Sequence, residues 1–260
     1  MFSVTYAQLN SWMAAFLWPL VRILALVASA PLFGNASVST PVKVGLSCFI
    51  TIIVAPTLGP MPQFTVFSAM GVWIIVNQFV IGAALGLTMQ IVFTAIQATG
   101  EFVGLGMGLG FATFFDQQSS GSTAVLSSYL NVFAMLVFLV LDGHLQMVSA
   151  LIATFQTLPI SADLLGAAGW RSLVNWGGTI FSMGLLLALP VVAALLIANL
   201  SLGILNRAAP QIGVFQIGFP LTMLVGMLLL QLMVPNMIPF FARLFDNGIE
   251  QMGRVAAGLH

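Results

Sequence analysis

Charge is the property that this sequence has least of. Only 5% of its 260 residues are Asp, Glu, Lys or Arg, whereas 60% are hydrophobic, and the mean hydropathy is +1.11. A soluble domain carries about 25% charged residues, because its surface must meet water. The shortage of charge excludes a water-soluble fold and indicates an integral membrane protein in contact with membrane lipid.

Cysteine, histidine and an excess of either charge are also lacking. Cys48 is the one cysteine, which excludes an internal disulfide and a cysteine-rich metal site. The two histidines, His144 and His260, are too few for a zinc site, and we expect neither a metal nor a cofactor. Six basic residues balance six acidic residues, so the net charge gives no indication of a nucleic-acid partner.

Apolar runs long enough to cross a bilayer are, by contrast, abundant. A hydrocarbon core about 30 Å thick needs roughly 20 apolar residues per helix. Proline, glycine and small polar residues divide the chain into about six such helices, so we expect one all-α integral membrane domain over residues 1–260, built of long, partly kinked helices. The expected ranges are 10–33, 42–54, 66–99, 124–158 with an interruption at Asp142-Gly143-His144, 172–206 and 208–242.

The last two runs are uncharged and equal in length, with Arg207 alone between them. Each contains an internal proline, Pro190 or Pro220, and proline removes a backbone hydrogen bond and kinks a helix. The simplest interpretation is a hairpin of two long, bent helices. The expected residues of its tip are Asn206, Arg207, Pro210 and Gln211.

Arg22 and four glycines are the candidates for helix packing or assembly. An arginine at the centre of a membrane helix costs about 2.5–3.5 kcal/mol, so Arg22 is expected either to reach the membrane interface or to make a buried contact within the chain or with another subunit. Small residues let membrane helices approach closely, either as a simple packing face or around a narrow channel. The four glycines are Gly82, Gly86, Gly100 and Gly104.

The stretch from Gly100 to Ser122 separates two apolar halves and combines glycines with phenylalanines. Irregular backbone at membrane depth is tolerated only where protein covers it or water lines it. We therefore predict that this stretch lines or closes a passage, with the glycines as a hinge and the phenylalanines as the obstructing groups. The predicted gate residues are Gly106, Gly108, Gly110, Phe111, Phe114, Phe115 and Asp116.

Catalysis and autonomous transport are the alternative classes. Asp142 and His144 could form an acid–base pair, but a turn at a helix end is the simpler interpretation. Ser120 lies in a serine-rich loop without a base at a defined spacing, so we expect no catalytic residue. A solute transporter would need ionisable groups in mid-helix, and apart from Arg22 these are missing.

Four segments resemble the FliR family of flagellar export-gate subunits, which has SctT-like counterparts in virulence type III secretion systems. The longest is NLSLGILNRAAPQIGVFQIGFPLT, from Asn199 to Thr222. The others are RILALVASAPLFG (22–34), GEFVGLGMGLGFATFFD (100–116) and DGHLQMVSALIATFQTLPI (142–160). They occur in the family's order, and the resemblance extends over nearly the whole chain. The sequence departs from the family's usual residues at Gly106, Gly110, Gln117 and Asp142.

The resemblance implies a non-enzymatic subunit of an export gate in the bacterial inner membrane, within the flagellar basal body. Its implied partners are FliP and FliQ subunits, the associated FlhB, and the unfolded flagellar export substrates that pass through a central pore. The loop at 106–122 is implied to contribute to the plug that closes the pore. The resemblance also implies a P-like part over about 1–170, joined to a Q-like helical hairpin over about 171–250.

Overall fold

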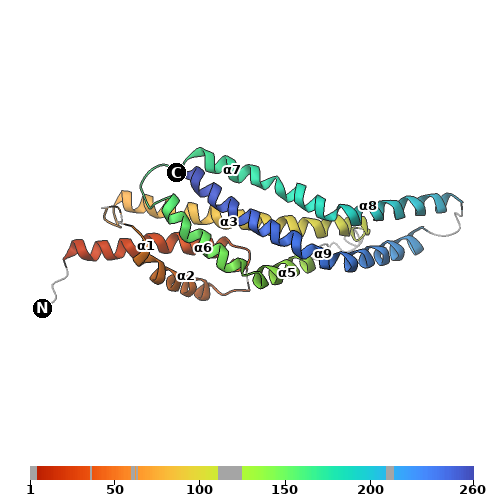
Figure 1. Ribbon diagram of the computed structural model, residues 1–260, viewed down its shortest axis with the longest axis horizontal. Helices are drawn as coiled ribbons and strands as arrows, with labels where there is room; N and C mark the ends of the chain where they lie inside the picture. The colour runs from red at the N-terminus through yellow and green to blue at the C-terminus, as the bar shows by residue number, and fades with distance from the viewer. Residues whose placement is uncertain (1–4, 36, 60–61, 63, 111–124, 209–213) are drawn as a thin grey trace. The chain divides into compact units, whose positions relative to one another are not determined.

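The computed structural model describes residues 5–35, 37–59, 62, 64–110, 125–208 and 214–260, and these ranges contain helices and connections without a strand (Figure 1). Among them, five helices are long and apolar enough to cross a membrane, or six if α5 and α6 count together as one span. This confirms the expected all-α membrane class. The elements are α1 (Tyr6–Ser29), α2 (Thr40–Val54), the short 3-10 helix η1 (Ala55–Thr57), α3 (Ala69–Gly106), α5 (Val125–Val140), α6 (Gly143–Thr157), α7 (Ala167–Gly177), α8 (Thr179–Ala208) and α9 (Val214–Leu259).

The chain divides into two compact units, each assembled from separate stretches of sequence. Unit 1 takes residues 1–91, 142–177 and 245–260, and unit 2 takes residues 92–141 and 178–244. Helices α3 and α9 therefore contribute residues to both units. These two units are defined by contacts in space. The expected division at about residue 170 into P-like and Q-like parts rests on the family resemblance, and it stays a prediction.

Unit 1 is organised around α1 and the first part of α3, which run in the same direction. Gly82 lies against the Arg22 carbonyl, and one turn later Gly86 lies against the Ser29 hydroxyl. At the start of α1, the Asn10 amide donates to the Phe64 carbonyl over 3.1 Å, which ties the connection before α3 to α1. These contacts fix the register of the two helices.

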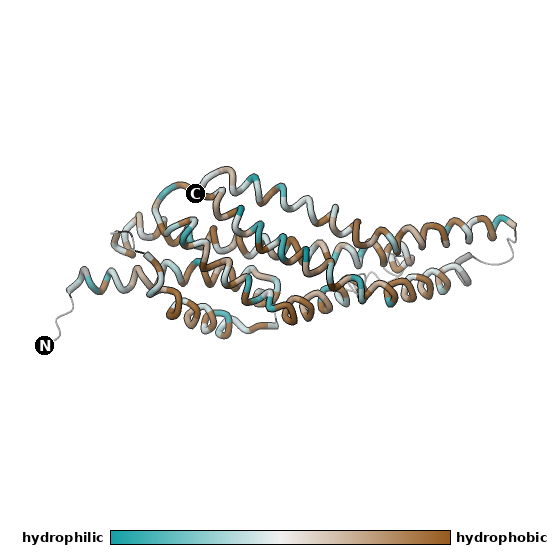
Figure 2. Tube along the Cα trace, viewed as in Figure 1, coloured by the Kyte–Doolittle hydropathy of each residue, from teal (hydrophilic) through white to brown (hydrophobic). Residues whose placement is uncertain are grey.

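Unit 2 has its own apolar core where the end of α3 meets α5, α8 and α9. Phe93 of α3 and Phe138 of α5 pack edge to face, with ring centroids 5.5 Å apart. Hydropathy is high along α8 and along the part of α9 that pairs with it (Figure 2). The fully or nearly buried members of this core are Val103, Met107, Leu126, Ala188, Val191, Leu195 and Leu230.

Several of the expected helix boundaries were wrong. The first run, expected at 10–33, is α1 at Tyr6–Ser29. Helix α3 does not end at residue 99 but continues to Gly106, so the first part of the glycine-rich stretch is helical. The run expected at 172–206 is divided into α7 and α8 at the Gly177-Gly178 pair, because glycine loses more backbone entropy in a helix than other residues do. Helix α9 continues past residue 242 to Leu259, because the first charged residues end an apolar run without ending the helix.

Candidate functional site

Arg22 is completely buried in unit 1 and uses its guanidinium to join three helices. Its Nε donates to Gln78 Oε1 of α3 over 2.7 Å. Its Nη1 lies 3.3 Å from the Thr154 carbonyl of α6, and its Nη2 donates to the Leu158 carbonyl over 3.0 Å. The structure therefore supports the expectation of a buried contact within the chain.

The charge of Arg22 is balanced mainly by a helix end. Thr154 and Leu158 belong to the last turn and the C-cap of α6, where the helix dipole is negative; the Thr154 carbonyl also accepts from the Leu158 amide over 2.8 Å. The guanidinium carbon also lies 4.2 Å from the centre of the Phe155 ring, a cation–π contact. Within the described ranges, no carboxylate forms an ion pair with Arg22. Arg22 thus acts as a side-chain cap that fixes α6 against α1 and α3.

Gly82 and Gly86 form the face of α3 that meets α1. A Cβ atom on Gly82 would collide with the Arg22 carbonyl and come within 2.8 Å of the Ala25 Cβ. One on Gly86 would collide with the Ser29 hydroxyl and lie 3.1 Å from the Leu26 carbonyl. The close approach of these helices therefore requires glycine at both positions.

Gly100 and Gly104 lie further along α3, in unit 2, and have different surroundings. A Cβ atom on Gly100 would come within 2.5 Å of the Ser127 Cα and 2.6 Å of its nitrogen, so the backbones of α3 and α5 touch there. On Gly104 the nearest described atom would be Leu109 Cδ1, at an ordinary contact distance of 3.7 Å. The structure brings Gly100 to a helix crossing and leaves room at Gly104.

The C-terminus of α3 is closed by a hydrogen-bonded cap centred on Gly108. The amide of Leu109 donates to the Gly104 carbonyl and that of Gly108 to the Leu105 carbonyl, both over 3.0 Å. This pair of bonds is the Schellman motif, which needs a left-handed residue, and Gly108 has a φ of 82°. The Leu109 side chain lies over Gly104, which has no side chain of its own at this position of the motif.

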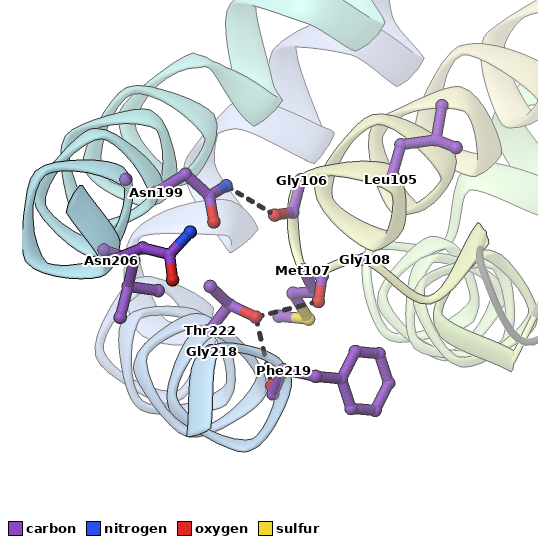
Figure 3. A pocket seen from close by; sticks show the side chains of 11 residues that line it. Leu105, Gly106, Met107, Gly108, Asn199, Asn206, Gly218, Phe219 and Thr222 are labelled. Carbon is purple, nitrogen blue, oxygen red and sulfur yellow. Dashed lines mark hydrogen bonds between the residues drawn. The ribbon is translucent and has the colours of Figure 1, made fainter. Parts of the chain in front are cut away.

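Helices α8 and α9 hold this cap from two sides (Figure 3). The Asn199 amide of α8 donates to the Gly106 carbonyl over 3.4 Å, and the Thr222 hydroxyl of α9 lies 3.0 Å from the Met107 carbonyl. The Met107 side chain lies directly against Gly226, where a Cβ atom would come within 2.7 Å of its Cγ. The last carbonyls of α3, which lack donors within the helix, thereby gain side-chain partners.

A cavity of about 340 Å³ lies beside this cap within unit 2. The Asn206 amide faces it from α8, while its floor combines glycine backbone with the Thr222 side chain (Figure 3). The lining residues are Leu105, Gly106, Met107, Gly108, Asn199, Leu202, Gly203, Asn206, Gly218, Phe219 and Thr222.

The remaining predicted site residues divide between described and undescribed parts of the chain. Gly106 ends α3, and Gly110 follows the cap closely. Asn206 and Arg207 are exposed in the last turn of α8, where a basic residue complements the helix dipole. Predicted residues outside the described ranges are Phe111, Phe114, Phe115, Asp116, Pro210 and Gln211.

Sequence reasoning missed Asn199, Thr222 and Gly226 as partners of the α3 cap. A signal was present, because Asn199 and Thr222 are the first and last residues of the long motif that resembles FliR. They are polar residues among apolar ones on either side of the hairpin tip, so they were candidates for a shared contact. Among described residues, no group of three or more His, Cys, Asp and Glu is placed to hold a metal ion.

The fold and its packing define a class, an all-helical membrane protein of several spans whose helices meet through glycine and polar caps. Residues 13–248 match the family model of bacterial export proteins, family 1. The flagellar biosynthetic protein FliR of Pectobacterium carotovorum subsp. carotovorum is 45% identical over 249 residues, covering 96% of this chain and 95% of the relative.

Other FliR proteins are also similar to this chain over nearly its full length. FliR of Escherichia coli K12 is 45% identical over 247 residues, covering 95% of this chain and 94% of the relative. FliR of Bacillus subtilis strain 168 is 24% identical over 246 residues, covering 94% and 95%. The chain belongs to the FliR family of flagellar export proteins.

Proposed function

We propose that the chain is a pore-forming, non-enzymatic subunit of the flagellar type III export gate in the bacterial inner membrane, within the basal body. In this proposal it assembles with FliP and FliQ subunits around a central channel, FlhB associates with the assembly, and unfolded flagellar substrates pass through. Residues 106–122 contribute to the plug that closes the channel. Membership of the FliR family places the chain among flagellar export proteins, and we add to it a place and a role within the export gate.

One observation carries the proposal: the two longest apolar spans are mostly exposed, because the rest of the chain buries little of them. In the spans Ala167–Ala208 and Gly218–Leu259, only 28% and 22% of the most apolar window is buried, against 67% in Ala69–Gly106. Exposed leucine and isoleucine follow α8 and the first half of α9, for example Leu196, Ile197, Leu200, Leu224, Leu228 and Leu232. Such surfaces need a cover, either lipid or neighbouring subunits.

Polar groups on the same helix favour neighbouring subunits over lipid. Asn199, Gly203 and Asn206 line the open side of the cavity beside the α3 cap, where all three stay exposed and a Cβ atom added at Gly203 would meet nothing within 4 Å. Amide side chains facing lipid are costly, and small residues mark helix interfaces in membranes. We therefore assign this face of α8 to a contact with another export-gate subunit.

The plug role draws support from the way the segment begins. The stretch at 106–122 starts from a capped helix end that is anchored to α8 and α9 by the Asn199 and Thr222 side chains. A plug on a fixed base returns to one position after each opening, whereas a plug on a free tether does not. Large phenylalanine side chains then supply rigid apolar bulk.

Co-purification tests the proposed assembly, and the chain offers a matched pair of glycines for it. A Cβ atom would meet nothing within 4 Å at either Gly203 of α8 or Gly253 of α9. Gly253 neighbours Arg254, which is exposed and pairs with Glu250 over 3.3 Å, so its surroundings suit water or headgroups. Gly203→Trp should greatly reduce recovery with tagged FliP and FliQ, and Gly253→Trp should not. Equal recovery of both variants at the unmodified level would contradict the α8 interface, and absence of any complex with the unmodified chain would contradict the function.

A further inference from the structure

Thr222 has two hydrogen-bond acceptors within reach of one hydroxyl proton. Its Oγ1 lies 3.0 Å from the Met107 carbonyl at the end of α3 and 3.0 Å from the Phe219 carbonyl of its own helix, α9. A threonine hydroxyl carries a single proton, so it donates to one of the two carbonyls or shares that proton between them in a three-centre bond. The side chain is 4% exposed and lies at the edge of the cavity beside the cap.

The two acceptors make the anchor of α3 reversible. While the proton points at Met107, the hydroxyl holds the α3 cap on α9. If the cap moves away, rotation toward Phe219 keeps the hydroxyl satisfied, so the penalty of an unpaired buried donor does not arise. A buried threonine without a second acceptor would resist release much more strongly.

The other two contacts of the cap are weaker or less specific. The Asn199 amide reaches the Gly106 carbonyl only at 3.4 Å, and Asn199 is exposed. Met107 contributes packing against Gly226, but its unbranched side chain adapts readily to a shifted backbone. The buried hydroxyl of Thr222 is therefore the contact that selects one position for the cap.

We propose that Thr222 is a positioning residue, a two-acceptor latch that holds the C-terminal cap of α3 on α9 and releases it when the hydroxyl turns to its own helix. This rests on the proposed function in one respect, namely that the channel gate begins at this cap. The latch then sets how often the base of the gate leaves its closed position.

Three variants separate the latch from general packing. Thr222→Val keeps the shape of the side chain and removes the proton, while Thr222→Ser keeps the proton. Thr99→Val is the matched control, because Thr99 is also buried in unit 2 and its hydroxyl also lies between two carbonyls, of Ala95 at 3.2 Å and of Gly184 at 3.1 Å. Thr99 joins α3 to α8 without touching the cap.

The direct readout is amide hydrogen exchange of residues 105–110 in the assembled complex. The amides of Met107, Gly108 and Leu109 are protected by bonds of 2.9–3.0 Å within the cap. Thr222→Val should accelerate their exchange roughly 3- to 10-fold, the effect of one lost hydrogen bond, and Thr222→Ser should restore it. Thr99→Val should leave this peptide unchanged. Exchange that stays at the unmodified rate in Thr222→Val would overturn the proposal.

Ion conductance of the reconstituted complex is the second readout. Thr222→Val should increase the closed-state leak, whereas Thr222→Ser and Thr99→Val should not. Faster exchange with an unchanged leak would overturn the gating role of the latch. Failure of the unmodified chain to join a conducting complex would instead overturn the proposed function, and the same exchange measurement on the purified chain would then decide the anchoring role by itself.

Discussion

Arg22 and Leu158 are joined across 136 residues of sequence, with the Arg22 Nη2 donating to the Leu158 carbonyl over 3.0 Å. Leu158 is the C-cap of α6, so a buried cation of α1 completes the end of another helix. Five groups stabilise the buried guanidinium: the Gln78 side chain, the Thr154 hydroxyl, two carbonyls and the Phe155 ring.

Arg22→Leu should destabilise the chain and impair assembly more than closure of the channel. The change leaves the Leu158 carbonyl and Gln78 Oε1 buried without these donors, and we expect a loss of about 2–4 kcal/mol in the free energy of unfolding. Arg254→Leu is the control, because its ion pair with Glu250 is exposed and contributes little. Thermal unfolding of the purified chain and the yield of complex check the prediction. A normal complex yield from Arg22→Leu would refute it.

Gly100→Ala should weaken the contact between α3 and α5. The new methyl group would lie within 2.5 Å of the Ser127 Cα, and separating two packed backbones costs about 1–3 kcal/mol. Gly104→Ala should be tolerated, since its methyl group meets only Leu109 at 3.7 Å and alanine favours the helix. Unfolding temperatures of the two variants, measured in one detergent, give the comparison, and equal values would show that the crossing does not depend on glycine.

Gly108→Ala should loosen the cap of α3. Its φ of 82° lies in the left-handed region, where a Cβ atom costs roughly 1–2 kcal/mol. Gly108→Asn should cost less, because asparagine tolerates this region better than other residues with a side chain. The measurement is the rate of amide hydrogen exchange at residues 107–109. The rate should be highest with alanine at position 108, lower with asparagine and lowest with glycine. The reverse order would contradict the assigned cap.

The apolar runs predicted the fold class because they are a local property of sequence. The interruption at Asp142 separates α5 from α6 as predicted, and there Asp142 itself adopts a left-handed φ of 54°. Arg207 precedes the end of α8 at Ala208, so the helices of the expected hairpin begin and end near the expected positions on either side of the tip.

The missing parts of the prediction depend on contacts between distant residues. Gly100 lies where α3 crosses α5, against the backbone of Ser127. The glycine-rich stretch itself contains no information about that neighbour. The partners of Arg22 include two backbone carbonyls, which every residue possesses, so no residue type could identify them. Thr222 finds Met107 across 115 residues for the same reason.

The gate residues Phe114 and Phe115 were predicted from composition and resemblance, and they lie outside the described residues. The described structure ends the helix before them and fixes where that segment starts. Gly106 and Gly108, predicted as part of a hinge, are bound into the α3 cap, so hinge motion would have to break the cap or begin beyond it. Their predicted role in the gate remains a prediction.

Ion conductance of the complex reconstituted with FliP and FliQ tests the central claim most directly. Two changes are compared with the unmodified complex, Phe114→Ala with Phe115→Ala in one chain, and deletion of part of 106–122. If this segment contributes to the plug, both changes should raise the closed-state conductance, because they remove the bulk that obstructs the channel. An unchanged leak in both complexes would contradict the account.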